Sequence, residues 1–284
     1  MSSLPLLKRV WRNKAFAVGG GLLLLILLIA LFAPWLSPHD PYVQDLANRT
    51  VPPVWKDRGT WLHPLGTDPL GRDYLSRLLY GARISLLIGI SVAFISGLIG
   101  TTMGMLAGYF GGKTDMLVSF LVTTRLSMPV ILVALATVAL VGGSLWIVIL
   151  VLGLLKWDRF AVVMRSATQQ VRSLDYVAAA QSAGASTPRI LLGEVLPNVM
   201  PHLIVVATLE AASAILLEAA LSFLGLGVQL PLPSWGLMIS EAKAYMFFSF
   251  WLIAIPGGAL ALLIFAINLA GDGLHDLLAP EGRA

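Results

Sequence analysis

Long apolar stretches without a charged residue constrain this chain more than any other feature. Three of them, residues 15–36, 84–110 and 247–270, contain no Asp, Glu, Lys or Arg. Each is long enough to cross a bilayer as a helix, which takes about 20 apolar residues. The chain is 57% hydrophobic and 12% charged, against about 25% charged in a typical soluble domain. These features exclude an ordinary soluble protein.

A fourth charge-free run, residues 126–155, is too long for one ordinary span. Gly142, Gly143 and Ser144 offer a turn inside it, which divides the surrounding apolar region into two helices. We therefore predict an all-α polytopic membrane protein. Its six transmembrane helices are expected near residues 15–36, 84–109, 116–140, 145–165, 200–226 and 247–270.

The distribution of basic residues predicts the orientation in the membrane. Cytoplasmic flanks carry an excess of Lys and Arg, and four such residues precede the first span. The N-terminal segment 1–14 is therefore expected in the cytoplasm, together with the loop 166–199 and the C-terminal segment 271–284. Residues 37–83 then lie outside. They hold six Lys or Arg against this rule, but the basic residues before the first span carry more weight.

The 37–83 segment divides into two parts. DPYVQDLANRTVPPVW is rich in Pro and polar residues and is expected to be irregular. GTDPLGRDYLSRLLYGAR is polar and then amphipathic, and predicts a helix lying at the outer interface before the second span. The segment is either a docking surface for a partner protein or a structural cap over the helix bundle.

The polar stretch DYVAAAQSAGASTPRILLGEVLPN, residues 175–198, separates two apolar regions. Its first part favours a helix that ends at Gly184, because Gly readily takes the left-handed conformation that closes a helix. A second helix is expected to begin at STPR, with Ser186 or Thr187 as the cap and Pro188 in its first turn. This arrangement of helix, turn and helix suits docking into a partner's groove. A connector that only rests on lipid headgroups fits it equally well.

This stretch resembles the EAA loop of permease subunits of binding-protein-dependent ABC importers. More narrowly, the chain is similar to the C-type permease of the dipeptide, oligopeptide and nickel importer family. Six segments carry the resemblance over nearly the whole chain and in family order. They are HPLGTDPLGRDYLSRLLYGARISL (63–86), GYFGGKTD (108–115), YVAAAQSAGAS (176–186), LPNVMPHLIV (196–205), EAALSFLGLGVQLPLPSWGLMI (218–239) and NLAGDGLHDLLAP (268–280).

The resemblance implies a type I ABC importer fold, with a five-helix permease core at 84–270. It implies a subunit in the bacterial inner membrane that forms half of the path for peptides or a related small solute. The implied partners are membrane lipid, a second related permease in a heterodimer, two ATPase subunits and an extracytoplasmic substrate-binding protein. ATP and Mg²⁺ would sit on the ATPases, because this chain has no G-x-x-x-x-G-K-[ST] loop. No catalytic residue, bound cofactor or nucleic acid is expected here.

In such importers, the helix of the EAA loop seats in a cleft of the ATPase and is called the coupling helix. The positions that match it here are Ala178, Ala179, Ala180, Gln181, Ser182, Ala183, Gly184, Ala185 and Ser186. The Glu that gives the loop its name is replaced by Ala178, which leaves a role in docking by shape intact. Other departures from the family pattern, which weaken inference on the substrate, fall on Phe120, Thr123, Arg159 and Val162.

Six ionisable residues fall inside predicted spans: Arg125, Lys156, Asp158, Arg159, Glu210 and Glu218. Charges inside a membrane are costly and face a partner or a water-filled path. At a rise of about 1.5 Å per residue, Glu210 lies at the level of Arg125, Lys156 and Arg159. We predict that Glu210 pairs with Arg159 or Lys156, with Arg125 as a further candidate. The set either lines the path or only holds the helices together.

Two other functions compete with an ATP-driven importer. The intramembrane charges would also suit an ion-coupled secondary transporter, although such a carrier has no ATPase to dock. An intramembrane enzyme is disfavoured because no convincing nucleophile, base or metal set is visible. The four histidines are scattered without metal-ligand spacing, and no metal site is expected at His39, His63, His202 or His275.

Overall fold

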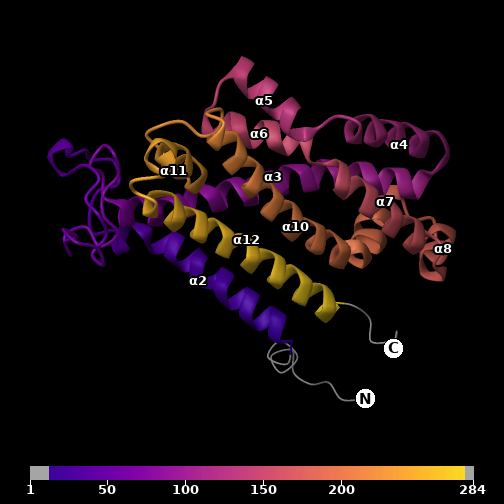
Figure 1. Cartoon of the computed structure of the whole chain (residues 1–284). Coiled ribbons are helices and arrows are strands. Elements are labelled where there is room, and N and C mark those ends of the chain that lie inside the picture. Colours follow the sequence, from indigo (N-terminus) through magenta and orange to yellow (C-terminus); the bar gives the residue numbers. More distant parts are fainter. Residues whose placement is uncertain (1–12, 279–284) are drawn as a thin grey trace.

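Four long helices form the body of the molecule in a computed structural model that describes residues 13–278. They are α2 (Lys14–Leu36), α3 (Tyr74–Phe110), α10 (Leu196–Phe223) and α12 (Trp251–Leu278). Figure 1 shows α2 and α12 running side by side, with α3 and α10 crossing behind them. No strand occurs between residues 13 and 278, so the expected all-α class is confirmed. The expected end segments 1–14 and 271–284 lie mostly outside the described residues, at 1–12 and 279–284, and the described part of the second, residues 271–278, continues α12.

The predicted span 116–140 is broken into two helices. α4 (Gly112–Leu126) and α5 (Val130–Val141) meet at an angle of 80°. Pro129 occupies the N-cap of α5 with an extended backbone. A proline has no N–H to donate and disfavours helix at the residue before it, so the chain turns at this point. Composition did not reveal the break, because residues 126–141 on both sides of Pro129 carry no charge.

The predicted span 145–165 is also divided. α6 (Leu145–Leu155) ends before Lys156, and α7 (Asp158–Arg172) begins after Trp157. By length and composition the described residues hold four helices able to cross a membrane, or five if α4 and α5 form one broken span. The expected six unbroken spans are therefore not met. The apolar pattern located the regions correctly but not the breaks within them.

The 37–73 segment is irregular apart from the short helix η1 (Leu46–Asn48). The separate interfacial helix expected before the second span is absent from it. Instead, Asp73 caps α3, accepting a hydrogen bond at 2.8 Å from the backbone N of Ser76. The amphipathic residues from Tyr74 onward are the first turns of one continuous helix of 37 residues. A good cap directly before the apolar run lets that helix begin early.

Short helices complete the two ends of the molecule. α11 (Trp235–Ala242) and η3 (Lys243–Tyr245) lie beside the 37–73 segment, and α8 (Asp175–Ser182) lies at the opposite end (Figure 1). After α8, α9 (Thr187–Ile190) continues through the π-helical turn η2 (Leu191–Val195) into α10. The second helix expected along the membrane is thus the first part of the long helix that contains α10.

Close packing of α3 on α7 fixes the position of the charged residues on α7. A Cβ on Gly104 would lie 2.5 Å from the carbonyl oxygen of Ala161, and a Cβ on Gly108 would lie 2.6 Å from that of Arg165. No side chain fits at these distances, so the small residues of α3 allow the two backbones to touch. The packing explains why Phe160, Ala161 and other α7 residues are fully buried.

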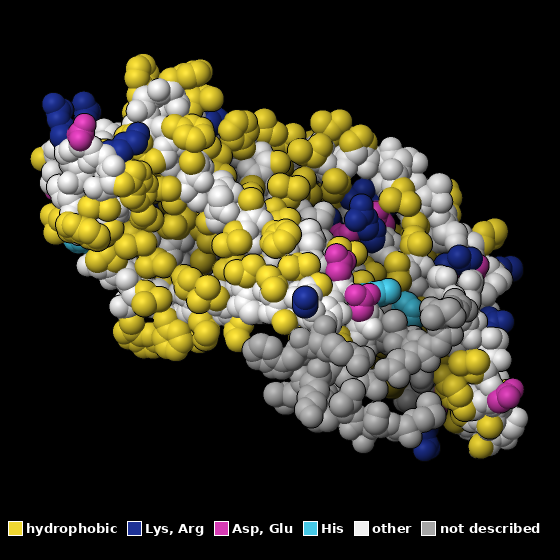
Figure 2. Space-filling model, turned by 60° about the horizontal axis from the view of Figure 1, so that its bottom comes forward, with side chains coloured by type: hydrophobic (Ala, Val, Ile, Leu, Met, Phe, Trp, Pro, Cys, Tyr) yellow, Lys and Arg dark blue, Asp and Glu magenta, His cyan; other side chains and the backbone are white. Residues whose placement is uncertain are grey.

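Much of the outer surface is apolar. Figure 2 shows hydrophobic side chains covering most of the middle of one face. Exposed large hydrophobic residues occur on every long helix, for example Leu31, Phe94, Leu216 and Phe265. Patches of this extent on a protein surface indicate contact with lipid or with a partner protein. The fold is a helix bundle with hydrophobic side chains both in its core and on its outer surface.

Candidate functional site

The turn at residues 175–186 lies at the end of the molecule opposite the 37–73 segment and is largely exposed (Figure 1). Seven of the nine residues predicted for the coupling helix are exposed, and the other two, Ala180 and Ala185, are half-buried. Apart from Gln181 their side chains are small, so the surface consists largely of backbone, methyl groups and two serine hydroxyls. A partner with a matching groove could approach it closely.

Gly184 closes this turn with a complete set of helix-ending hydrogen bonds. Its backbone has φ +75°, in the left-handed region. The N–H of Gly184 donates to the carbonyl of Gln181 at 3.0 Å, and the N–H of Ala185 donates to that of Ala180 at 3.1 Å. These two bonds are the Schellman motif that ends many helices. Nothing lies within 4 Å of a Cβ built at Gly184, so backbone conformation and not space requires the glycine.

Buried contacts hold the turn against the bundle. Val177 is fully buried and packs with Met105 of α3, Met164 of α7 and Ile190 of α9. On the rim, the amide of Gln181 donates to the hydroxyl of Tyr109 at 3.1 Å. Val177 therefore connects α8 with α3, α7 and the start of the α10 helix by direct packing. Ser186 occupies the N-cap position of α9, but its side chain makes no capping hydrogen bond.

Three of the six intramembrane ionisable residues meet at the break between α6 and α7. Lys156 Nζ lies 2.7 Å from Glu210 Oε2, and Arg159 Nη1 lies 3.2 Å from Glu210 Oε1. We call these three residues the Glu210 cluster. Both contacts are ion pairs by distance, but their angles fall outside hydrogen-bond geometry. The Glu210 side chain is 1% exposed and that of Arg159 is 67% exposed, so one end of the cluster is dry and the other is open.

Lys156 also ties the break directly to α10. Its ammonium donates a hydrogen bond to the hydroxyl of Ser213 at 2.8 Å, one turn along α10 from Glu210. Lys156 is the residue at which α6 ends, with φ −111° and ψ 17°. Lys156 therefore anchors the discontinuity between α6 and α7 to two residues of α10.

The other three ionisable residues lie elsewhere. Arg125 donates hydrogen bonds to the carbonyls of Leu155 and Met128, at 2.6 and 3.2 Å. It therefore binds carbonyl groups near the ends of α6 and α4 and does not pair with Glu210. Asp158 is buried in the first turn of α7, where the helix dipole favours an acid. Glu218 is fully buried and accepts from the hydroxyls of Ser222 and Ser234, at 2.7 and 2.9 Å, which joins α10 to α11.

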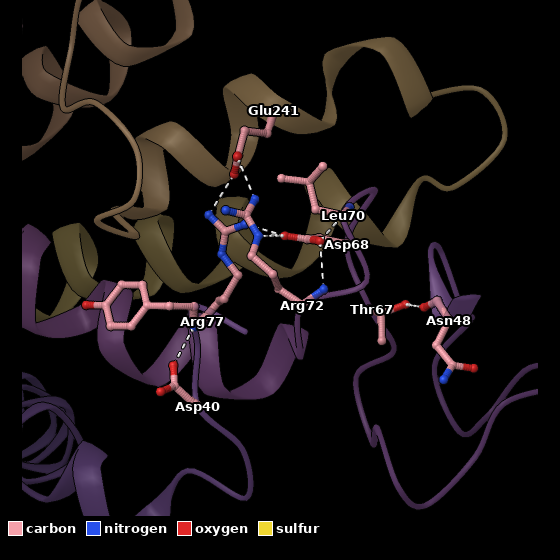
Figure 3. A network of polar contacts seen from close by, with 9 residues as sticks. Asp40, Asn48, Thr67, Asp68, Leu70, Arg72, Arg77 and Glu241 are labelled. Carbon is pink, nitrogen blue, oxygen red and sulfur yellow. Dashed lines mark hydrogen bonds and ion pairs between the residues drawn. The ribbon is translucent and has the colours of Figure 1, made fainter. Parts of the chain in front are cut away.

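A second charged group, unnoticed in the sequence, lies at the opposite end of the molecule. Asp68, Arg72, Arg77 and Glu241 close a ring of ion pairs (Figure 3). Arg72 reaches Asp68 at 2.6 Å and Glu241 at 2.7 Å, while Arg77 reaches both of the same acids. We call these residues the four-residue ring. It fastens the 37–73 segment and α3 to α11, which lies 164 positions beyond Arg77.

The amino-acid sequence indicates only part of this four-residue ring. Asp68 and Arg72 stand four residues apart, a spacing that invites pairing, but nothing in the sequence connects them to Glu241. The expectation that the histidines are scattered is wrong for one pair. The rings of His39 and His63 have centroids 4.8 Å apart, beside Asp73.

An open apolar groove of about 960 Å³ runs along α3 and α10. Its walls include Phe94 and Leu98 of α3, and Met200 and Ile204 of α10. The groove reaches Thr187 and Pro188, directly after the exposed turn. A protein helix or lipid chains would fill such a space.

Two family models match the chain. Residues 100–283 match the binding-protein-dependent transport system inner membrane component, and residues 6–53 match the N-terminal TM domain of oligopeptide transport permease C. The chain belongs to this family of permeases. The 175–186 turn and the Glu210 cluster both lie within the larger match.

Relatives in Pseudomonas aeruginosa and Escherichia coli resemble the permease over nearly their whole length. The di/tripeptide transport system permease protein DppC of Pseudomonas aeruginosa (strain UCBPP-PA14) is 43% identical over 97% of this chain and 92% of its own. The dipeptide transport system permease protein DppC of Escherichia coli (strain K12) is also 43% identical, over 95% of this chain and 90% of its own. The permease is therefore a membrane-spanning transport subunit by family.

A solved structure shares its fold. A chain of the inward-facing MetNI methionine ABC transporter aligns with a TM-score of 0.59 over 72% of the permease and 96% of that chain. The sequences are 19% identical, so this likeness bears on the fold alone. It confirms the type I ABC importer architecture expected from the sequence.

Proposed function

We propose that this permease forms half of the translocation path of an ATP-driven importer of dipeptides or similar short peptides. The names of the two relatives described above support the substrate class. The observation that carries the coupling role is the exposed, Schellman-closed turn at 175–186, with a surface of small side chains. In this proposal the turn seats in a cleft of an ATPase subunit, and ATP with Mg²⁺ binds there and not on the permease.

The internal contacts supply a route from the turn to the path. Movement of α8 acts through Val177 on α7 and on the helix that contains α10. Lys156 and Glu210 join these two elements at the α6–α7 break. In our proposal the buried Lys156–Glu210 pair is a latch between helices, and the open side of Arg159 faces the path.

The remaining surfaces match the other proposed partners. A second, related permease would cover the apolar groove between α3 and α10 and complete the path in a heterodimer. A substrate-binding protein would dock on the 37–73 segment, which lies at the opposite end from the turn (Figure 1). In this proposal the 37–73 segment lies outside the inner membrane and both termini lie in the cytoplasm. The start of α2 lies beside the last part of α12, because the side-chain amide of Asn13 donates a hydrogen bond to the carbonyl of Gly273 at 3.3 Å.

Site-specific crosslinking tests this proposal directly. The sequence contains no cysteine, so single-cysteine variants need no background removal. Ser182→Cys, in the turn, is expected to crosslink to a co-expressed ATPase subunit. Asp57→Cys, exposed in the 37–73 segment, is the matched control and is expected to crosslink to the binding protein and not to the ATPase. The reverse pattern, or equal crosslinking of both variants to the ATPase, would refute the assignment.

Reconstituted transport tests the energy source. Vesicles holding the permease, its partner permease and the ATPases should take up a labelled dipeptide with ATP and binding protein. They should not do so with a proton gradient alone. Uptake driven by the gradient without ATP would instead establish the ion-coupled carrier, and uptake by vesicles that lack the second permease would contradict the heterodimer.

A further inference from the structure

Three side chains that are far apart in the sequence converge where the 37–73 segment meets α3. His39 follows the end of α2, His63 lies in the irregular part of the segment, and Asp73 caps α3. Asp73 Oδ1 lies 2.9 Å from His63 Nδ1 and 3.6 Å from His39 Nδ1. One ligand atom from each of the three residues lies within 4.8 Å of the other two. No other part of the transport mechanism described above uses these groups.

The spacing fits a tetrahedral metal ion. With bonds of about 2.0–2.1 Å, two ligands of one tetrahedral zinc ion lie about 3.3 Å apart. The two distances to Asp73 bracket this value. The His39 side chain is 34% exposed, which leaves it room to rotate and close the remaining gap, and leaves a side open for water and for the ion to enter.

The surroundings already orient the carboxylate. Oδ2 of Asp73 accepts hydrogen bonds from the backbone N and the hydroxyl of Ser76, at 2.8 and 2.7 Å. The backbone N of His39 also bonds the Ser76 hydroxyl, at 3.2 Å. These bonds turn Oδ1 toward the two imidazoles and hold the start of the His39 side chain nearby. Fixed outer contacts of this kind are what metal sites use to orient their ligands.

His39 supplies an observation that a simple ion pair does not explain. A hydrogen bond between His63 and Asp73 accounts for two of the three groups. His39 Nδ1 is buried and has no hydrogen-bond partner. A buried polar atom without a partner is costly and requires an explanation, and an ion bound beside it is one that also fits the neighbouring His63 and Asp73.

We propose that His39, His63 and Asp73 form a binding site for a divalent transition-metal ion, best matched by Zn²⁺. Two imidazole nitrogens and one carboxylate oxygen supply three ligands of borderline hardness, and a water molecule fills the fourth position. The bound ion ties the end of α2, the 37–73 segment and the first turn of α3 together. It therefore stiffens the surface on which a partner would dock.

Metal titration of the full-length chain in detergent, purified without a histidine tag and stripped with a chelator, tests the site. Zn²⁺ is added in competition with a chromophoric chelator, and Co²⁺ is added as a spectroscopic probe of four-coordinate geometry. The wild type is expected to bind about one ion per chain. His39→Ala and His63→Ala should each weaken binding by at least about tenfold, the smallest loss seen even for outer-shell changes.

Three further variants make the test specific. Asp73→Asn keeps a residue that caps helices well but removes the anionic ligand, so it should fold and bind metal weakly. His202→Ala and His275→Ala, at exposed histidines elsewhere, should bind as the wild type does. Zn²⁺ should raise the melting temperature of the wild type and of both controls, but not of His39→Ala.

Other results would overturn the proposal. Wild type that binds no more Zn²⁺ than the His39→Ala/His63→Ala double variant has no such site. Equal weakening by His202→Ala places the ion elsewhere. Unchanged binding in Asp73→Asn excludes the three-residue site even if both histidines matter.

Discussion

The four-residue ring and the Glu210 cluster both bury charges of opposite sign, but they are built differently. In the ring, two arginines each contact the same two acids, and Asp68 also accepts backbone N–H groups from Leu70 and Arg72. In the Glu210 cluster, one acid faces two bases without hydrogen-bond geometry, and one of those bases is largely exposed. The ring is closed, whereas the cluster is open on one side.

The difference matches what each end of the molecule is proposed to do. Planar guanidinium groups that bond carboxylates at two points fix geometry as well as charge. A lysine is a flexible point charge that can follow a moving partner. The ring joins three elements that hold the proposed docking surface, and the cluster sits at a helix break that we propose to move. In our proposal the ring keeps the outer end rigid while the Glu210 cluster adjusts, so that the permease transmits a change without losing its outer shape.

The largest effect is expected from breaking the ring. Arg77→Met keeps an unbranched apolar stem but removes the guanidinium, which leaves Asp68 and Glu241 with Arg72 as the one cation between them. Arg77 is 1% exposed. Removing one member of a buried pair costs about 3–5 kcal/mol in soluble proteins. We expect a large fall in the amount of folded permease and in its melting temperature in detergent.

A nearby arginine provides the control for this change. Arg83 is exposed on the same helix, with its guanidinium 5.7 Å from the ring of Tyr80. Arg83→Met should change stability by no more than about 0.5 kcal/mol, as surface substitutions usually do. Equal stability of Arg77→Met and Arg83→Met would show that the four-residue ring contributes nothing to stability. The proposed difference between the ring and the Glu210 cluster would then fail.

A smaller effect on stability, but a large one on transport, is expected at the turn. Gly184→Val forces a β-branched residue into the left-handed region, at a cost of about 1–2 kcal/mol. That cost is met by unwinding the end of α8 and not by unfolding the bundle. We expect the variant to assemble in the membrane yet to lose peptide uptake and the ATPase stimulation that accompanies it.

The matched control lies nine residues further along the chain. Gly193 is also exposed and also has open space where a Cβ would stand, but its φ is not positive. Gly193→Ala should keep uptake close to that of the wild type. Asn tolerates the left-handed region better than most residues, so Gly184→Asn should retain more uptake than Gly184→Val. Full uptake by Gly184→Val would argue against coupling through this turn.

How far the sequence predicted the molecule depends on whether the signal is local. Gly184 was identified because one glycine after a helix-forming stretch is a local signal. The apolar runs gave the helical class for the same reason. The bend at Pro129 was missed because span prediction counted charges, and a proline inside an apolar run is consistent with both a kink and a break.

Contacts between residues distant in the sequence were predicted only where the regular rise of a helix gives the depth of each residue. Counting residues along the helices placed Lys156 and Glu210 at one level, and the structure brings them together. The same count failed for Arg125, because the chain turns by 80° just after it. In the sequence, Asp73 is only a polar residue before a helix. No spacing rule connects Asp73 to His39, and none connects Asp68 to Glu241. Those contacts depend on tertiary structure.

The smallest effects are expected within the Glu210 cluster, and there the order of the effects is the test. Polar pairs between membrane helices contribute about 0.6 kcal/mol on average, up to about 1.7. Lys156 is buried and also bonds Ser213, so its coupling to Glu210 should fall at the upper end of this range. Arg159 is 67% exposed, and water weakens its coupling to well below about 1 kcal/mol. Arg125 shares no partner with Glu210 and should show none.

Double-mutant cycles measure these three couplings in melting temperature and in peptide uptake. The variants are Glu210→Gln, Lys156→Met, Arg159→Gln and Arg125→Gln, alone and in pairs with the first. The exchange Lys156→Glu with Glu210→Lys should recover part of the uptake that either change removes. If the pair acts as a latch, Glu210→Gln should also raise ATPase activity without peptide, since it loosens the α6–α7 break. Additive effects at all three bases would show that the acid and its neighbours act independently, and the proposed latch would then have to be abandoned.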